Sequence, residues 1–303
     1  MIEKRCLQEN ELEAWFSHCQ SIFQLEDPLY FQKHYRLDPA ADATLIFVAL
    51  HEGEIVSSVR VFDRTVWIRG QAVHCGGVGE VSTQPAFQRQ GLASALLQMA
   101  LDEMVRRHMQ VSILFGKRPF YRHMGWHPVP VAKRKADVRQ LPLLKTEQVT
   151  IRPFHIQDLL ILQGIYDLYA GRFDGAILRS EAYWQQWVLG QWHMPYVLLQ
   201  EDRPAAYCCA NTSGKDGVLH VCELCAVPQA ERLLPHLVAS IAHLHACETI
   251  FFSMSFLPGL SGEKTDTGSM MIRINDPQFF AGSTASFVET FMQNPGMFAV
   301  DRF

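Results

Sequence analysis

One short segment, residues 88–93, has residue types and a spacing that could bind an anion. Its sequence, QRQGLA, fits the pattern Gln/Arg-x-x-Gly-x-Gly/Ala between a β-rich run and an apolar helical stretch. Backbone N–H groups at a helix start lack partners within the helix, and the helix dipole favours negative charge there. Gly91 permits a close backbone approach, Ala93 keeps the first helical turn clear, and Arg89 can add a charge-assisted contact. A lone glycine is often only a turn, but this context favours a pyrophosphate-binding loop.

The flanking sequence predicts the helices and strands that would hold this loop. Apolar residues at helical spacing predict helices over 11–25, about 28–35, and from about 92 onward. Runs rich in β-branched and aromatic residues predict strands at 44–50, 54–62, 72–83 and 111–115, then a short helix at 117–123 and a strand from 125. The polar segment 133–148 reads as a connector. The predicted fold class is α/β (α+β).

The second half of the chain repeats this plan at an offset of 143 residues. Residues 80–91 align with 223–234, so that Glu80 matches Glu223 and Pro85 matches Pro228. In each copy a strand ends near the glutamate, the proline follows five residues later, and an apolar helix begins. The repeat predicts two copies of one fold.

Length, composition and charge limit the class of protein. A chain of 303 residues with 48% hydrophobic residues favours a globular protein of two domains. A net charge of −4 argues against nucleic-acid binding, which needs a concentrated excess of basic residues. Residues 1–148 hold 18 basic and 16 acidic side chains, which leaves 9 basic and 15 acidic in residues 149–303. The first half therefore suits an anionic ligand better than the second.

The eight cysteines are expected to be reduced thiols of a cytoplasmic protein. The chain is long enough to fold without disulfides, and its first residues do not resemble a secretory leader. Cys222 and Cys225 have the spacing of half a zinc site, but a strand over 218–227 would place them on opposite faces. We interpret them as buried thiols and predict no metal, because the histidines also lack ligand spacing. No apolar run approaches about 18 residues, so no membrane span is predicted.

These features together resemble the GCN5-related N-acetyltransferases (GNAT), whose acetyl-CoA pyrophosphate loop residues 88–93 match. The chain is further similar to the Eis-type (enhanced intracellular survival) acetyltransferases. That resemblance covers GGVGEVS at 76–82, FYRHMGW at 120–126, YDLY at 166–169, GAILR at 175–179, and Trp184. It extends over most of residues 1–275.

The resemblance implies two tandem GNAT folds, each a mixed central sheet flanked by helices. A catalytic domain at 1–145 would bind acetyl-CoA, a degenerate second GNAT-like domain would occupy 146–275, and a C-terminal tail 276–303. Only 28 residues follow Asn275, too few for the third, sterol-carrier-like domain of Eis-type enzymes. The second loop has Glu231, Leu234 and His236 in place of Gln88, Gly91 and Ala93, so it would repel and crowd a pyrophosphate. We expect the second domain to be catalytically silent.

The resemblance also implies roles for individual residues. Tyr121 matches the proton-donor tyrosine of the family, with a core aromatic as the alternative. The base is either the terminal carboxylate of Phe303, as in Eis-type enzymes, or Glu80 on the strand beside the cofactor. Backbone groups of residues 81–83 would pair with the pantetheine arm like an added strand. The expected cofactor-binding residues are Val81, Ser82, Thr83, Gln88, Arg89, Gln90, Gly91, Leu92, Ala93 and Ser94.

The expected function is that of an acetyl-CoA-dependent N-acetyltransferase acting on a primary amine. The family and the acidic second half favour a small cationic amine. A protein N-acetyltransferase is one alternative, and a non-catalytic acyl-CoA sensor or scaffold is another. The oligomeric state is left open, a homo-oligomer included.

Overall fold

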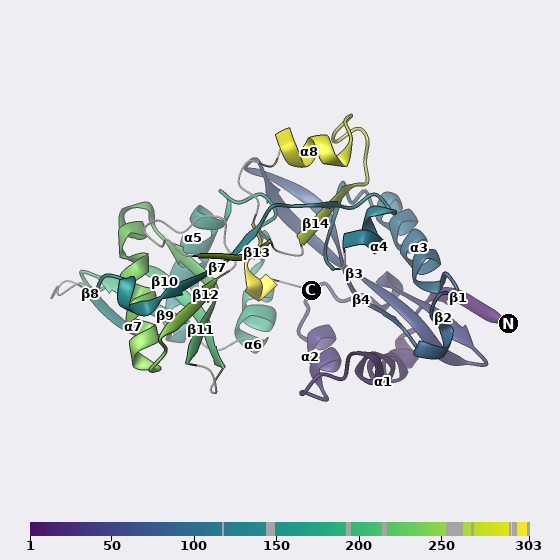
Figure 1. The fold of residues 1–303 in the computed structure, drawn as a ribbon, viewed down its shortest axis with the longest axis horizontal. Coiled ribbons are helices and arrows are strands. Elements are labelled where there is room, and N and C mark those ends of the chain that lie inside the picture. The colour runs from purple at the N-terminus through teal and green to yellow at the C-terminus, as the bar shows by residue number, and fades with distance from the viewer. Residues whose placement is uncertain are drawn as a thin grey trace.

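The strands form two seven-stranded sheets, which Figure 1 shows as two lobes that meet near the centre of the molecule. The computed structural model describes residues 1–116, 118–143, 149–191, 195–213, 217–252, 263–267, 270–290, 292 and 296–301. Both sheets are mixed and flanked by helices. The predicted α/β class with two mixed sheets is confirmed.

The first sheet has the strand order β1-β2-β3-β4-β5-β14-β6. Neighbouring strands are antiparallel except β4 and β5, which are parallel. The strands are β1 (Ile2–Cys6), β2 (Ile46–His51), β3 (Glu54–Ile68), β4 (Gln71–Thr83), β5 (Val111–Phe115), β14 (Met270–Ile274) and β6 (His127–Pro128).

The second sheet has the order β8-β9-β10-β11-β12-β7-β13, again with one parallel pair, β11 and β12. Its strands are β8 (Val149–Pro153), β9 (Tyr196–Gln200), β10 (Arg203–Ser213), β11 (Val218–Ala226), β12 (Thr249–Phe252), β7 (Ala132–Asp137) and β13 (Glu263–Thr267). The parallel pair occupies the fourth and fifth positions in both sheets. This common order confirms the internal repeat.

The local structure after the fourth strand also repeats. Pro85 and Pro228 each open a 3-10 helix, and an apolar helix follows, α3 (Leu92–Arg106) in the first lobe and α7 (Leu234–Leu244) in the second. The remaining helices are α1 (Leu12–Phe23), α2 (Tyr30–Arg36), α4 (Arg118–Arg122), α5 (Leu159–Ala170), α6 (Leu189–Gln191) and α8 (Thr284–Thr290).

The sixth strand of each sheet comes from the other half of the chain. β14, from residues 270–274, lies between β5 and β6 in the first sheet, and Figure 1 shows it in olive among the blue strands of that lobe. β7, from residues 132–137, lies between β12 and β13 in the second sheet. The prediction of a polar connector over 133–148 is therefore wrong for residues 133–137, since partners on both sides hold this basic segment as a strand. Residues 144–148 lie outside the described residues.

A second difference from the sequence prediction is β1, which was not predicted. It is a short edge strand whose residues are mostly half-buried or exposed, so it lacks the apolar alternation that marks a strand. Its pairing with β2 places the chain start at the rim of the first sheet.

The first sheet is covered on both faces, which explains the unbroken apolar run of β2. Ile46, Val48 and Leu50 pack in a cluster with α1 and α2, whereas Phe47 and Ala49 pack in a cluster with α3. Successive side chains of a strand point to opposite faces, so a strand between two helical layers has no polar side. Among the helices of the described residues, none has the length and apolarity needed to cross a bilayer.

The two lobes are also joined by a short segment of the second half, which pairs with β3 beyond the end of its pairing with β2. The N–H of Trp67 donates to the carbonyl of Ala176 at 2.8 Å, and the N–H of Leu178 donates to the carbonyl of Thr65 at 2.8 Å. Val66 and Ile177 form an antiparallel bridge between them. The GAILR motif of the sequence thus lies against the first sheet.

Candidate functional site

The strand β4 separates from β5 where the site begins. Within the described residues, their pairing ends at Val78 opposite Leu114. On its other side, the register of β4 against β3 shifts between Ser58 and Arg60, and Glu80 takes a φ of 52°. A bulge of this kind bends a strand and redirects its side chains. The last residues of β4 therefore have an edge on the β5 side that no described strand pairs with, and we call it the free edge of β4.

A cavity of about 580 Å³ lies beside this edge and the loop that follows it. Gly91 precedes the first residue of α3 and has a φ of 76°, a conformation that glycine adopts without strain. The first residues of α3 line the cavity, and the first N–H groups of a helix have no partner within the helix. The lining residues are Ile22, Val81, Ser82, Thr83, Phe87, Gln88, Arg89, Gly91, Leu92, Ala93, Ser94 and Phe120.

Nearly all of the predicted cofactor-binding residues line this one cavity. The exception is Gln90, which lies in the same loop and whose amide Nε2 donates to the carbonyl of Ala86 at 3.3 Å. The amide of Gln88 donates to the carbonyl of Thr83, also at 3.3 Å, and so ties the loop to β4.

A second cavity, of about 310 Å³, shares Val81 with the first and is lined by both Glu80 and Tyr121. Tyr121 lies on α4, where its ring packs edge-on against Trp126 at 6.1 Å. A Cβ on Gly116 would lie 2.3 Å from the Tyr121 ring, so only glycine leaves room for the ring there. Burial raises the pKa of the Tyr121 phenol, which keeps its proton in place at neutral pH.

Glu80 is held in a buried cluster of charges. Its Oε1 lies 2.8 Å from Nδ1 of His34 and 3.5 Å from Nη1 of Arg60. Arg60 also donates to Asp38 at 2.9 Å, and Asp38 accepts a further bond from Arg64 at 2.9 Å. Burial lowers the pKa of His34 against the opposing effect of Glu80, so the neutral ring is favoured. The two carboxylates and the two guanidinium groups of this cluster carry equal and opposite charge.

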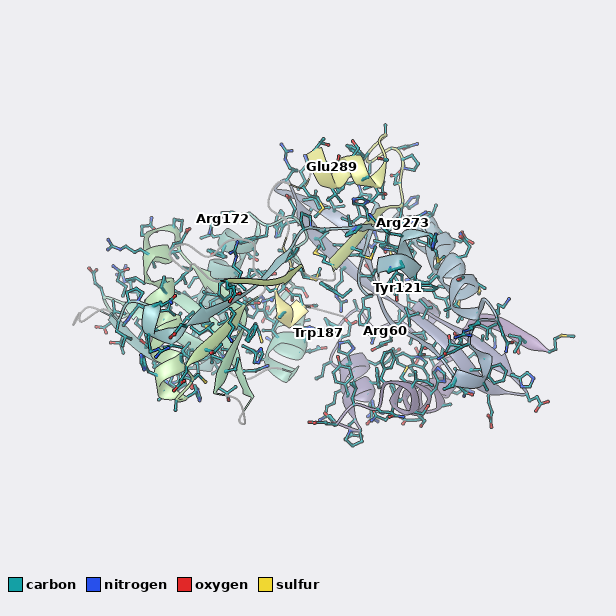
Figure 2. All side chains as sticks on the ribbon, viewed as in Figure 1. Arg60, Tyr121, Arg172, Trp187, Arg273 and Glu289 are labelled. Carbon is teal, nitrogen blue, oxygen red and sulfur yellow. The ribbon has the colours of Figure 1, made fainter. Side chains whose placement is uncertain are left out.

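The second lobe contacts this cluster through Trp187, in the π-helical segment Tyr183–Val188. Its ring lies 4.6 Å from that of His34 and 6.3 Å from that of Phe62, and the guanidinium of Arg64 lies 5.2 Å from it. Figure 2 shows Arg60, Tyr121 and Trp187 in the middle of the molecule, where the two lobes face each other.

The sequence reasoning missed His34, Asp38, Arg60 and Trp187. One signal was available, because Arg60 lies inside the apolar run of β3 and a buried guanidinium needs a charged partner. The identity of that partner depended on the packing of α2 on the sheet.

The matching position of the second lobe holds a closed cluster. Glu223 accepts from Arg179 and from the hydroxyl of Tyr207, and Arg179 donates to both carboxylate oxygens of Asp301 at 2.9 Å. These charged side chains are fully buried, and burial raises the pKa of Glu223. The hydroxyl of Tyr166 lies 3.3 Å from Asp301 and donates to the carbonyl of Ile177 at 2.7 Å.

The second loop also differs from the first. Glu231 forms an ion pair with Arg172 at 2.7 Å, and Figure 2 labels Arg172 on that lobe. Leu234 and His236 are buried. Cys222 and Cys225 are buried free thiols, as interpreted from the sequence.

Two further predictions concern the chain end and metals. Phe303, the alternative base, lies outside the described residues. Among the residues that are described, no three His, Cys, Asp or Glu side chains group in a way that could hold a metal ion.

The chain shares its fold with proteins of known family. Residues 3–129 match the family model for an acetyltransferase (GNAT) domain. A conserved protein of unknown function from Enterococcus faecalis V583, described as a probable N-acyltransferase, has a TM-score of 0.76 and 16% identity over 92% of this chain and 74% of that one. Eis1 from Mycobacterium abscessus has a TM-score of 0.65 and 18% identity over 90% of this chain and 74% of that one.

A tandem GNAT protein from the clavulanic acid biosynthesis pathway has a TM-score of 0.59 and 12% identity over 91% of this chain and 99% of that one. At such identities the likeness shows the fold, and it extends over both lobes. The family match supports acyl transfer as the general chemistry. Residues 3–129 therefore match a GNAT acetyltransferase domain, and the chain has the fold of a tandem GNAT protein.

Proposed function

We propose that this protein transfers an acetyl group from acetyl-CoA to the nitrogen of a primary amine. One observation carries the proposal: the cavity beside residues 88–94 and the cavity lined by Glu80 and Tyr121 meet at Val81, on the free edge of β4. A donor in the first cavity and an acceptor in the second would meet at that edge.

The first cavity suits the CoA part of the donor. The N–H groups at the start of α3 and the side chain of Arg89 offer hydrogen bonds to a pyrophosphate. The free edge of residues 81–83 offers backbone groups to the amides of the pantetheine arm, as an added strand would. The acetyl thioester would then lie near Val81.

The second cavity supplies the groups for proton transfer. The neutral amine nitrogen attacks the thioester carbonyl, a C–N bond forms, and the C–S bond breaks. We assign Glu80 to accept the proton that the nitrogen loses and Tyr121 to donate a proton to the leaving thiolate. The products are an N-acetyl amide and free CoA thiol. His34 and Arg60 hold the Glu80 carboxylate, so they are positioning residues.

The second lobe is proposed to be catalytically silent. Its counterpart of Glu80 is Glu223, which is buried against Arg179, and its loop presents the Glu231–Arg172 ion pair. An acid at the start of that helix would repel a pyrophosphate.

The test is an assay of free thiol release from acetyl-CoA against a panel of amines and a lysine-containing peptide. Turnover with small amines supports the proposal, whereas turnover with the peptide alone would favour a protein N-acetyltransferase. Tight binding of acetyl-CoA with no turnover on any acceptor would favour a non-catalytic sensor or scaffold.

The loop assignment has a matched pair of variants. Gly91→Glu should weaken acetyl-CoA binding at least about tenfold, because it adds a negative charge and a side chain where the pyrophosphate would lie. Gly70→Glu is the control: it too has a positive φ and open space around a Cβ, but it lies at the opposite end of β4. Calorimetric titration measures both, and equal affinities would remove the loop from the donor site.

A further inference from the structure

We infer that the acceptor is a small primary amine carried on an aromatic body with a single positive charge, and not a polyamine or another polycation. This inference rests on the proposed function, because it concerns the cavity that contains Glu80 and Tyr121.

The walls of the cavity are largely aromatic. Phe31 is one of the lining residues, and its ring lies 5.3 Å from the ring of Phe23 and 5.1 Å from the ring of Tyr30. Tyr30 in turn stacks on His34 at 5.0 Å, and Phe115 and Tyr121 line the side toward β5 and α4. Aromatic faces at these separations offer stacking and edge contacts to a ring of a ligand.

The mouth of the cavity is also apolar. Phe23, Leu25 and Tyr30 line the cavity and remain 40%, 37% and 37% exposed, and all three lie at the turn between α1 and α2. Single exposed apolar residues are common, but a contiguous group around a cavity is typical of a surface that a ligand covers. An apolar acceptor would bury this rim as it enters.

The charged side chains around the cavity can pair with one ammonium group. Within the described lining, Glu80 is the acidic residue, and its carboxylate is already shared with His34 and Arg60. The neighbouring Asp38 is engaged by Arg60 and Arg64. A second ammonium would lose its hydration in this cavity without meeting another carboxylate of the described lining.

The acidic residues of the second half of the chain do not add a carboxylate to the described lining of this cavity. The described residues that line the two cavities all fall between positions 22 and 121. Glu223 and Asp301 of the second half are buried against Arg179 instead. The charge asymmetry of the sequence is thus no argument for a polycationic acceptor.

The size of the cavity fits the same class. Its volume of about 310 Å³ is at the lower end of the range of small-molecule pockets, roughly 300–1,000 Å³. One ring on a short alkyl chain fits within it, with the amine at Glu80 and the ring against Tyr30 and Phe31.

The experiment compares 2-phenylethylamine, n-butylamine and spermidine as acceptors of the full chain, by thiol release at saturating acetyl-CoA. We expect kcat/KM for 2-phenylethylamine to exceed that for n-butylamine and for spermidine at least tenfold. Equal values, or a preference for spermidine, would overturn the inference.

Variants of the rim locate the preference. Tyr30→Ala and Leu25→Ala should each lower the ratio of kcat/KM for 2-phenylethylamine to kcat/KM for methylamine at least fivefold, because methylamine does not reach the rim. The ratio cancels any general loss of activity. Leu244→Ala is the control, an exposed leucine at the end of α7 outside both cavities. An unchanged ratio in both rim variants would contradict the inference that Tyr30 and Leu25 contact the acceptor.

A binding measurement separates failure of this inference from failure of the proposed function. If no amine is acetylated, the three amines are titrated by calorimetry into the protein saturated with CoA. Binding of 2-phenylethylamine at least tenfold tighter than that of spermidine would support the acceptor class while the catalytic proposal fails. Equal binding, tighter binding of spermidine, or no binding of any amine would overturn it.

Discussion

At the scale of single residues, the position of the Tyr121 ring depends on one neighbour without a side chain and on one large aromatic neighbour. Gly116 leaves space for the ring, and Trp126 packs against its edge. Burial raises the pKa of the phenol, so the group remains a proton donor at neutral pH. The position between α4 and the free edge of β4 agrees with the proposed role at the leaving sulfur.

Tyr121→Phe keeps the ring and removes the donor. We expect kcat to fall about 100-fold, in the range of general acid catalysis, while acetyl-CoA binding changes less than about twofold. Steady-state kinetics and a binding titration measure the two effects. Tyr196→Phe is the matched control, since its hydroxyl contacts His245 in the second lobe. An unaltered kcat would remove Tyr121 from the role of acid.

Glu80 is the second residue that the proposal depends on. Glu80→Gln keeps the size of the side chain but removes the proton acceptor, so kcat/KM should fall about 100-fold at a temperature where the variant is folded. The melting temperature should fall as well, because the substitution removes one charge from the buried cluster. Glu231→Gln, in the loop of the second lobe, is the control and should retain activity. Full activity of Glu80→Gln would shift the role to another group, and one residue added after Phe303 would then test its carboxylate.

At the scale of elements, α1 is joined to the free end of β4 by a buried polar contact. Nε2 of His18 lies 2.9 Å from Oγ of Ser82, and Ser82 lies 3.0 Å from Ser58 on β3. Ser82 also lines the first cavity. The helix that bounds the acceptor cavity is thus tied to the strand proposed to bind the donor.

The burial of His18 predicts that the folded chain loses stability in acid. Burial lowers the pKa of His18 from 6.5 to about 4. Above pH 6.5 the ring is neutral in the folded and the unfolded chain, but between pH 6.5 and about 4 only the unfolded chain gains the proton. The free energy of unfolding should therefore fall by up to about 3 kcal/mol over that window on account of His18.

Denaturant unfolding of the wild type and of His18→Gln from pH 7.5 to 4 measures the contribution of His18 to the free energy of unfolding. The variant should lose less stability than the wild type over the same window. His123→Gln, which changes an exposed ring, should follow the wild-type curve. Parallel curves for the wild type and His18→Gln would show that His18 does not contribute.

At the scale of the whole molecule, the two lobes are interlocked. Each sheet takes its sixth strand from the other half of the chain, and residues 175–178 extend the pairing of β3. The GAILR and YDLY segments that resemble Eis-type enzymes supply Arg179 and Tyr166 to the buried cluster that holds Asp301. The second lobe completes the frame of the first and contacts its charge cluster through Trp187.

Residues 1–143 expressed alone should not fold cooperatively. The fragment lacks β14, so β5 is left as an unpaired apolar edge, and β7 has no partners. We expect no cooperative thermal transition by circular dichroism, and recovery of a transition on co-expression with residues 144–303. A monomeric fragment that melts cooperatively would contradict the interlocked arrangement.

Much of the frame could be read from local sequence. The strand at 111–115 and the helix after Pro85 follow from runs of neighbouring residues, and the loop at Gly91 follows from its pattern and context. The strand β7 could not be read in this way, because the basic residues at 133–135 lack apolar alternation. One of its partner strands, β13, also lies about 130 residues later in the chain. His34 and Arg60 carry no motif at all, and their meeting with Glu80 depends on how α2 packs on the sheet.

The sequence by itself determined the repeat, the order of most elements and the loop proposed to bind the donor, because backbone preferences and side-chain periodicity act between near neighbours. Only the tertiary structure decided which strands pair, which charges meet at Glu80 and what kind of wall faces the acceptor. Those choices depend on hydrogen bonds and buried charges between residues far apart in the chain, and local sequence does not encode their partners.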